Sequence, residues 1–483
     1  MTFNETYSQV QNQAGSFPRN RRESSPQFIS GPGRAIRPKP GIFLELLIRS
    51  YPMRNIQTKI ASYLLAAPLS ILLFACGGGS GGSDGLGLAL AALSQSSDPV
   101  LVRYADIAYQ SYNQAVIDAN SLKTAVQTFV SNPTSANLTA ARNAWVVARA
   151  SYLVSEPFRF SGGPIDADPG YCGGTAPSYS GTDACEGAIN AWPLDEIVID
   201  NYIATKASDG SDLTFEDLYS KNEDPTLAAG GEVGDTDQVV MTGYHAIEYL
   251  LWGKDESGSP AGVNLFPGQR TETYFTDATS GVRRKKYLTE AINGLIGHLT
   301  QVRDQWAGSY RSAFIAGGRN SKVAVFNGLG QFIASEWGGD RLQGITSGVQ
   351  EDEHSCFSDT TKADFYYDAQ GFLNIWTGNY SIVKGVNIST GPGLSTLVQS
   401  STSNFIIADA TQARDYFCIN LSNETSDPNY TASCASGTIS ERYDQIIMKS
   451  ANSTVAQQNL LDDLQSLLSG TLVSDFANAM SQY

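Results

Sequence analysis

Apolar side chains recur every three or four positions along most of this chain. Between Val100 and Val130 they mark one face of an amphipathic helix, at Val102, Ala105, Ala108, Tyr109, Tyr112, Val116, Ala119, Leu122, Val126 and Phe129. Asn132 and Pro133 interrupt the pattern, and Thr134 is placed to cap a second helix from Asn137 to Phe158. The sequence therefore predicts two consecutive helices here.

The same periodicity returns through the rest of the chain. It predicts helices over Asp237–Trp252, ended by Gly253, over Arg283–Phe314, Lys322–Glu336 and Ser440–Met480, and a helix start within Trp192–Ile203. Strand-like alternation is scarce. We therefore expect an all-α protein built of helical bundles.

The folded part divides into two predicted bundles, because about 400 residues exceed what one hydrophobic core usually serves. We place them at 99–270 and 271–483. ARASYLVSEPFRF, around Glu156, resembles LGQFIASEWGGDR, around Glu336, and each precedes a polar loop and an aromatic-rich segment, YHAIEYLLWG or GFLNIWTGNY. This similarity favours an internal duplication, while chance likeness of amphipathic helices is the alternative.

The first 98 residues have the pattern of an exported lipoprotein. Residues 53–76 begin with Arg54 and Lys59, continue in an apolar stretch and end in Leu-Phe-Ala-Cys, so we expect lipidation at Cys76. Residues 77–98 begin with a Gly/Ser-rich run and form the predicted tether. Residues 1–52 lack periodicity and are interpreted as a disordered upstream extension. A single transmembrane helix with a chance cysteine is the alternative for 53–76.

Charge changes the expected partners. The whole chain has 32 Lys+Arg against 48 Asp+Glu. Without the seven basic and three acidic residues of 1–52 and the two basic residues of the signal, 23 basic and 45 acidic residues remain, a net charge of −22. Such a surface repels nucleic acid and attracts cations. We expect no nucleic-acid partner, and an outer-membrane lipoprotein facing the periplasm or the cell surface.

Five cysteines follow Cys76. Cys172 and Cys185 bracket one polar loop and Cys418 and Cys434 another, which predicts two local disulfides in an oxidising compartment. Cys356 is left over. No C-x-x-C pair occurs, which argues against a thiolate zinc site.

The run MTGYHAIEYLLWG is the strongest chemical signal. At about 100° per residue, His245 and Glu248 point within about 60° of each other on one helix face. Burying an imidazole and a carboxylate together is costly unless they are satisfied. We predict both as metal ligands, with an ordinary pair of core residues as the alternative.

A metal needs further ligands from other segments. The candidates are Glu156 in SEPFRF, Asp195 in WPLD, and Glu353 and His354 in EDEHSCFSD. Carboxylates with imidazole suit iron, zinc or manganese rather than softer metals. As alternatives, Glu156 pairs with Arg159 and the acidic run at 351–353 is solvated. His298 has no acidic neighbour at helical spacing and is interpreted as structural.

Several other chemistries lack their motifs. The chain has no H-E-x-x-H, no G-x-S-x-G, no P-loop and no G-x-G-x-x-G after a strand. C-x-x-C-H is also missing, which excludes covalent c-type haem.

Gly243 to Glu248 match the G-x-H-x-x-E motif of the imelysin family. SEPFRFSGGPID, NAWPLDEIVID and EDEHSCFSDTTKADF resemble further segments of its iron-regulated envelope members. The resemblance spans about residues 100–480. It implies two helical bundles, export, often as a lipoprotein, and either iron acquisition or metallopeptidase activity, with motif roles for His245 and Glu248.

Three hypotheses follow. The first is an envelope lipoprotein that binds iron, or an iron-bearing ligand, for uptake with an envelope transport partner. The second is a zinc peptidase in which Glu248 or Glu353 is the general base to a metal-bound water. The third is a non-catalytic binding or scaffold module with a vestigial site. A second histidine near the H-x-x-E helix is missing from the sequence, which weighs against the peptidase.

Overall fold

The computed structural model describes residues 97–166, 184–224, 226–227, 238–254, 268–342, 353–382, 388–417, 438–439, 446 and 454–483. Regular structure in these residues is almost entirely helical, which confirms the all-α prediction. The α-helices are α4 Pro99–Ser131, α5 Ser135–Leu153, α6 Ala184–Asn190, α7 Glu196–Thr205, α8 Phe215–Tyr219, α9 Gly243–Trp252, α10 Thr273–Thr276, α11 Gly281–Gln305, α12 Ser309–Ala316, α13 Arg319–Gln331, α15 Thr361–Thr377, α16 Ser400–Asp415, α18 Val455–Ser466 and α19 Val473–Gln482.

Shorter elements connect these helices. They are the 3₁₀ helices η2 Glu156–Phe158, η3 Pro164–Asp166 and η8 Leu394–Leu397, and the π-helices η6 Phe332–Arg341 and η10 Leu467–Leu472. Two short strands, β1 Asn379–Tyr380 and β2 Ser389–Thr390, pair antiparallel. Arg103 of α4 contacts this strand pair. Its Nε donates to the Gly378 carbonyl at 2.7 Å and its Nη2 to the Ser389 carbonyl at 2.9 Å.

Helices α4 and α5 begin where the sequence predicts. Asp98 caps α4 by accepting from the Val100 amide at 3.0 Å, with Pro99 in the first turn. Thr134 caps α5 by accepting from the Asn137 amide at 3.2 Å, which confirms its predicted role. The apolar stripe of α4, from Ala105 to Phe129, is buried.

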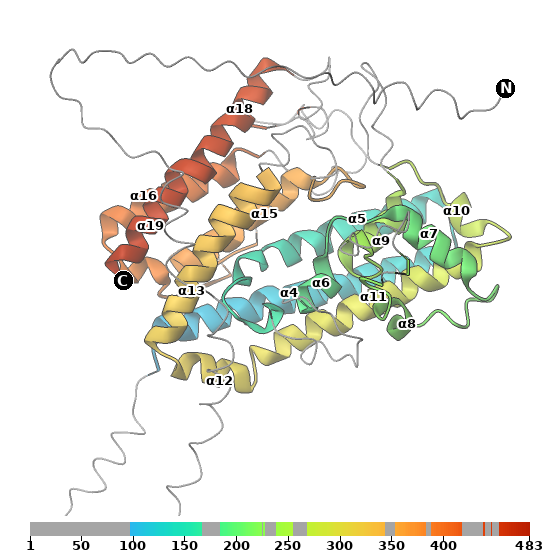
Figure 1. Cartoon of the computed structure of the whole chain (residues 1–483), viewed down its shortest axis with the longest axis horizontal. Coiled ribbons are helices and arrows are strands. Elements are labelled where there is room, and N and C mark those ends of the chain that lie inside the picture. Colours follow the sequence, from blue (N-terminus) through green and yellow to red (C-terminus); the bar gives the residue numbers. More distant parts are fainter. Residues whose placement is uncertain are drawn as a thin grey trace, which may run out of the picture. The chain divides into compact units, whose positions relative to one another are not determined.

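Helices α4, α5, α9 and α11 form one packed group, in which α4 lies against both α5 and α11 and α9 lies against α5 and α11 (Figure 1). All ten residues of α9 are buried. The helix ends at Gly253, as predicted, where a φ of +82° suits glycine. The motif helix is therefore enclosed by its neighbours along its whole length.

Helix α15 joins this group to the C-terminal helices. It packs against α5 on one side and against α16 on another, and α16 in turn packs against η10 and α19 (Figure 1). Residues 361–376 of α15 are all buried, including Lys362, Asp364 and Asp368. Gly371 permits the approach to α5, because a Cβ there would lie 2.4 Å from the Val154 carbonyl oxygen.

Some boundaries differ from the predicted ones. The helix predicted over Arg283–Phe314 is two, because α11 ends at Gln305 and α12 begins after Gly308. The helix over Lys322–Glu336 begins earlier, at Arg319, and widens into η6 after Gln331. Helix α9 begins at Gly243, later than Asp237, and α16 was not predicted.

Other predictions fall partly or wholly outside the described residues. The extension, the signal with Cys76 and most of the tether lie there, as do Cys172, Cys418 and Cys434. Cys185 and Cys356 are both buried. The division at residue 270 and the duplication stay predictions, although α11 lies against α4 across that division. In the described ranges, no helix combines the length and apolarity that crossing a bilayer requires.

Candidate functional site

The glycine of the H-x-x-E segment sets where α9 begins. Gly243 has a φ of +89°, and a Cβ there would lie 2.5 Å from the Ile189 carbonyl oxygen at the end of α6. Next to it, Thr242 donates from Oγ1 to the Ala188 carbonyl at 3.2 Å. The first turn of α9 is therefore pressed against α6, in a conformation that only glycine adopts without strain.

His245 and Glu248 form a buried hydrogen-bonded pair one turn further along α9. His245 Nδ1 lies 2.9 Å from Glu248 Oε2, and both side chains have no exposed surface. Glu248 Oε1 accepts from the Ser358 amide at 2.9 Å and from the Ser358 hydroxyl at 2.7 Å. Because both carboxylate oxygens are engaged, Glu248 orients the imidazole through Nδ1.

The far nitrogen of this imidazole is free. In the described part of the chain, His245 Nε2 is buried and has no hydrogen-bond partner. Burial, reinforced by the positive charges of Arg149 and Arg341, holds the pKa of His245 well below its ordinary value. The ring is therefore neutral at physiological pH, the state in which an imidazole nitrogen binds a metal ion.

Burial shifts the pKa of Glu248 in the opposite direction from that of His245. It raises the pKa of this carboxyl to about 8, although the Ser358 hydrogen bonds and Arg149 lower it. Near pH 7 the pair carries one proton on the carboxyl side and no net charge. A cation arriving beside the pair would favour release of that proton.

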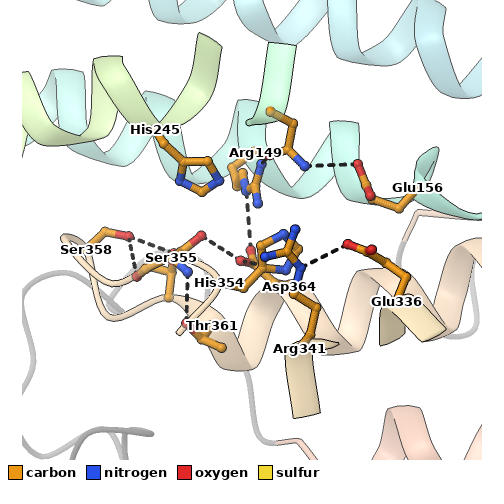
Figure 2. A network of polar contacts seen from close by, with 12 residues as sticks. Arg149, Glu156, His245, Glu336, Arg341, His354, Ser355, Ser358, Thr361 and Asp364 are labelled. Atoms are coloured by element: carbon orange, nitrogen blue, oxygen red, sulfur yellow. Dashed lines mark hydrogen bonds and ion pairs between the residues drawn. The ribbon is translucent and has the colours of Figure 1, made fainter. Parts of the chain in front are cut away.

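A second imidazole faces the first. His354 lies in the segment before α15, and its ring centroid is 6.1 Å from that of His245 (Figure 2). Its Nδ1 is 3.6 Å from Asp364 Oδ2, an oxygen that accepts from the Ser355 hydroxyl at 2.6 Å. Neither ring nitrogen of His354 has a hydrogen-bond partner among the described residues. Burial, then Arg341 and Arg149, lower its pKa well below the ordinary value.

Arg149 reaches the two histidines from α5. Its Nε lies 3.5 Å from Asp364 Oδ1, and its Nη1 donates to Asn190 Oδ1. Figure 2 shows the side chain descending from α5 toward Asp364, as His245 does from the neighbouring helix. The site therefore forms where α5 and α9 meet the beginning of α15.

Glu156, the carboxylate predicted from SEPFRF, belongs to an ion network beside this site. It accepts from Asn190 Nδ2 at 3.2 Å and from Arg159 Nη1 at 3.1 Å. Arg159 also lies 3.2 Å from Glu336 and 3.5 Å from Glu186. The contact with Arg159 is the alternative that the sequence left open, so Glu156 is engaged by other side chains.

Glu336 anchors the other end of this network. It accepts from Arg341 Nε at 2.9 Å as well as from Arg159. Burial raises its pKa, but Arg341 and Arg159 outweigh that effect and lower it to about 2. Glu336 is therefore ionised throughout the physiological range, and it holds the η6 segment against the α5–η2 turn.

The remaining predicted ligands have different surroundings. Asp195 caps α7, accepting from the Ile197 amide at 2.9 Å. From the same segment Trp192 reaches the site instead, with its ring 4.9 Å from that of His245. Glu353 is fully buried next to His354. The structure thus brings His245, Glu248 and His354 together, whereas Asp195 serves a helix terminus.

Sequence reasoning gave no role to Arg149, Asp364, Asn190 and Ser358, although the last three lie in the quoted segments NAWPLDEIVID and EDEHSCFSDTTKADF. Arg149 carried a usable signal, because it follows Ala148 and lies four residues after Trp145, on the apolar face of the predicted helix. Its guanidinium is 2% exposed. A charged residue on a buried face requires a partner, and this rule is enough to select Arg149 by its position in the helical pattern.

These residues meet only part of a metal site. Two neutral imidazoles with unpartnered nitrogens are suitable ligands. Across the described ranges, however, no group of three or more His, Cys, Asp or Glu side chains is placed to hold a metal ion. Nitrogen donors are thus available, but a complete protein-only coordination shell is not shown.

Comparison with known proteins shows the family through one match that spans most of the chain. A family model described as imelysin matches residues 108–469. Iron-regulated protein A of Synechococcus elongatus is 27% identical over 284 residues, which cover 57% of this chain and 60% of that protein. A crystal structure from Parabacteroides distasonis, described as an iron-regulated protein A precursor, is 14% identical, with a TM-score of 0.49 over 79% of this chain and 97% of its own.

Proposed function

The chain belongs to the imelysin family, and on this premise we propose that it is an envelope protein that binds a metal ion, iron before zinc, for iron acquisition. Imelysin proteins are generally secreted or envelope-associated. His245 and His354 would bind the ion, and Glu248 would orient His245. The ion is cargo in this proposal, passed on to an envelope transport partner.

One observation carries the proposal. Two buried, neutral imidazoles face each other at 6.1 Å between ring centroids, and His245 Nε2 has no hydrogen-bond partner in the described ranges. An unpaired buried nitrogen is costly and rare in a folded protein. A bound cation would satisfy it, which is the physical reason to prefer a binding site over an inert core pair.

Peptidase activity receives less support from the same geometry. A general base must reach a metal-bound water beside an extended polypeptide. Glu248 is 0% exposed, and its oxygens are engaged by His245 and Ser358. Such a buried carboxylate suits a small ligand better than a polypeptide chain.

The test is metal binding by a matched pair of histidine variants. We expect the parent protein to bind Fe²⁺ stoichiometrically in anaerobic calorimetry, and His245→Gln to lose most of that binding. His298→Gln is the control, because His298 is a buried histidine packed against Phe215 and Tyr219, outside the site. Helix content by circular dichroism should be unchanged in both.

Two results would contradict the proposal. Equal iron content in the parent and His245→Gln would remove the site from this location, and no iron or zinc binding at all would favour the scaffold alternative. Chelator-sensitive cleavage of an unfolded polypeptide, lost in Glu248→Gln, would favour the zinc peptidase instead.

A further inference from the structure

Arg149 is a buried charged group of this site that is only partly satisfied: Nη1 donates to Asn190 and the guanidinium lies 5.5 Å from the centre of the Tyr244 ring. Its guanidinium is 2% exposed, and in the part of the chain that the structure describes its Nη2 has no hydrogen-bond partner. Its Nε contact with Asp364, at 3.5 Å, is longer than a good hydrogen bond. Buried charged donors are otherwise nearly always paired, since leaving one unpaired is costly. The Nη2 group is therefore suited to an acceptor that the described residues do not supply.

The carboxylates nearest the histidines do not pair with Nη2 of Arg149. Glu248 already accepts from Ser358 through Oε1 and is bonded to His245 through Oε2. Asp364 Oδ2 accepts from the Ser355 hydroxyl, and its other oxygen faces Arg149 at 3.5 Å. Glu248 is thus fixed by partners within the protein, whereas Asp364 Oδ1 has no hydrogen bond among the described residues and lies 3.5 Å from Arg149 Nε.

The free ligand atoms at this site also differ from the set that an iron ion prefers. A non-haem Fe²⁺ site combines two imidazoles with a carboxylate oxygen, whereas the unpartnered groups that face each other here are imidazole nitrogens only. Neutral imidazoles bring no negative charge. A cation held between them would lie beside the buried charge of Arg149, an unfavourable pairing at low dielectric.

One ligand would pair with the free N–H of Arg149, supply oxygen ligands to the cation and bring the missing negative charge. We infer that the site takes its cation together with a carboxylate-type oxyanion, whose oxygens bind the cation on one side and the Arg149 N–H groups on the other. The planar fork of a guanidinium matches two oxygens on one carbon. The anion has two possible sources, free carbonate or a carboxylate of an organic chelate that carries the metal.

This inference rests on the proposed function, so its test varies the anion while metal binding is measured. Fe²⁺ binding to the full chain is followed by anaerobic calorimetry in carbonate-free buffer, then with bicarbonate, then with citrate. We expect bicarbonate or citrate to raise the affinity of the parent about tenfold to a hundredfold, the gain typical of a charge-assisted hydrogen bond to a buried partner. The effective anion identifies the source.

Substitution of Arg149 tests whether the effect of the anion on Fe²⁺ affinity depends on this guanidinium. Within each variant, affinities with and without the anion are compared: Arg149→Met should lose the anion dependence, and Arg149→Lys, which retains charge but not the fork, should keep only part of it. Arg414→Lys is the control, because Arg414 is a buried arginine of α16 that donates to Gln370, away from the histidines. If Arg149→Met fails to fold, Arg149→Lys alone decides.

The outcomes separate the two proposals. Metal binding of equal affinity with and without both anions would overturn this inference and leave the proposed function standing. An anion effect that persists in Arg149→Met and Arg149→Lys would also overturn it. Anion-independent binding that Glu353→Gln abolishes would show that the protein supplies the oxygen ligand itself. Absence of metal binding in every buffer would refute the proposed function.

Discussion

The two ring nitrogens of the buried His245 differ: Nδ1 is hydrogen-bonded, whereas Nε2 has no hydrogen-bond partner among the described residues. Glu248 holds Nδ1 at 2.9 Å, and Ser358 holds Glu248, so the ring orientation is set by a chain of hydrogen bonds that ends in the segment before α15. A single helical turn therefore does not make the site by itself. At the scale of residues, the Ser358 contacts favour an orienting role for Glu248 in the proposed site, and its predicted role as a ligand stays a prediction.

Gly243 gives the first prediction at this scale. Gly243→Ala places a Cβ 2.5 Å from the Ile189 carbonyl oxygen at a φ of +89°. Left-handed strain and overpacking should together lower the free energy of unfolding by about 2–4 kcal/mol. Urea unfolding of the variant and the parent measures this. Gly297→Ala is the control, because a Cβ there would meet nothing within 4 Å; similar losses in both variants would contradict the prediction.

His298 gives a pH prediction. Burial lowers its pKa from 6.5 to about 4, so between these values the unfolded chain binds a proton that the folded protein does not. Stability from this group is full above pH 6.5 and falls, by on the order of 3 kcal/mol, as the pH drops toward 4. His298→Gln should lose less stability than the parent between pH 7.5 and 4.5 in urea unfolding. Parallel losses would show that other groups dominate.

Helix α15 decides the site at the scale of elements. It carries Asp364 to Arg149 and follows the segment that holds His354 and Ser358. Its position against α5 depends on close backbone approach at Gly371. The site is thus assembled where α15 and the segment before it pack against α5 and α9, which are far away in the sequence.

Gly371→Ala tests this dependence. A Cβ 2.4 Å from the Val154 carbonyl oxygen must push α15 away from α5. We expect a loss of stability of about 1–3 kcal/mol and, because Asp364 moves from Arg149, weaker Fe²⁺ binding as well. Calorimetry and urea unfolding report the two effects separately. Gly470→Ala, where a Cβ would meet nothing within 4 Å, should change neither; an unaffected Gly371→Ala would refute the argument.

A second prediction concerns the contact between α16 and α19. Burial and the neighbouring Asp475 raise the pKa of Asp409 from 3.8 to about 6. The raised value means that stability from the protonated group is full below pH 3.8 and is lost as the pH rises through 6. Because Asp409 is partly exposed, the effect is modest. Asp409→Asn should melt a few degrees above the parent at pH 8 and at the same temperature at pH 4. A higher melting temperature at pH 4 alone would reverse the assigned sign.

The whole molecule combines an acidic body with a predicted lipid anchor. The full chain carries a formal net charge of −16, which favours attraction of cations over binding of nucleic acid. The anchor at Cys76 lies outside the described residues. A tethered acidic protein with a buried cation site would be suited to capturing metal ions close to the membrane.

Cys76→Ala tests the anchor. The parent expressed in a bacterial host should fractionate with membranes and partition into detergent, because an acylated cysteine adds about 0.8 kcal/mol of membrane affinity per buried CH₂. The variant should appear in the soluble fraction, and mass spectrometry should find lipid only on the parent. Cys356→Ala is the matched control. Equal membrane association of the Cys76→Ala protein would favour the transmembrane alternative.

The sequence alone determined the all-α class, several of the long helices, some of their ends and the H-x-x-E pair. Capping by Thr134, termination at Gly253 and the shared face of His245 and Glu248 depend on residues within one or two turns. Such relations follow from helix geometry, so they can be predicted without tertiary structure. The choice of the segment around His354 also came from composition.

Tertiary structure alone decided which groups complete the site. Ser358 reaches Glu248 across 110 positions, Arg149 meets Asp364 from another helix, and Trp192 rather than Asp195 contacts His245. No local pattern encodes these pairs, because they depend on how helices approach at glycines such as Gly371 and on which buried polar groups must satisfy each other. Helical periodicity is a local property, whereas the partners of a buried charge are fixed by packing.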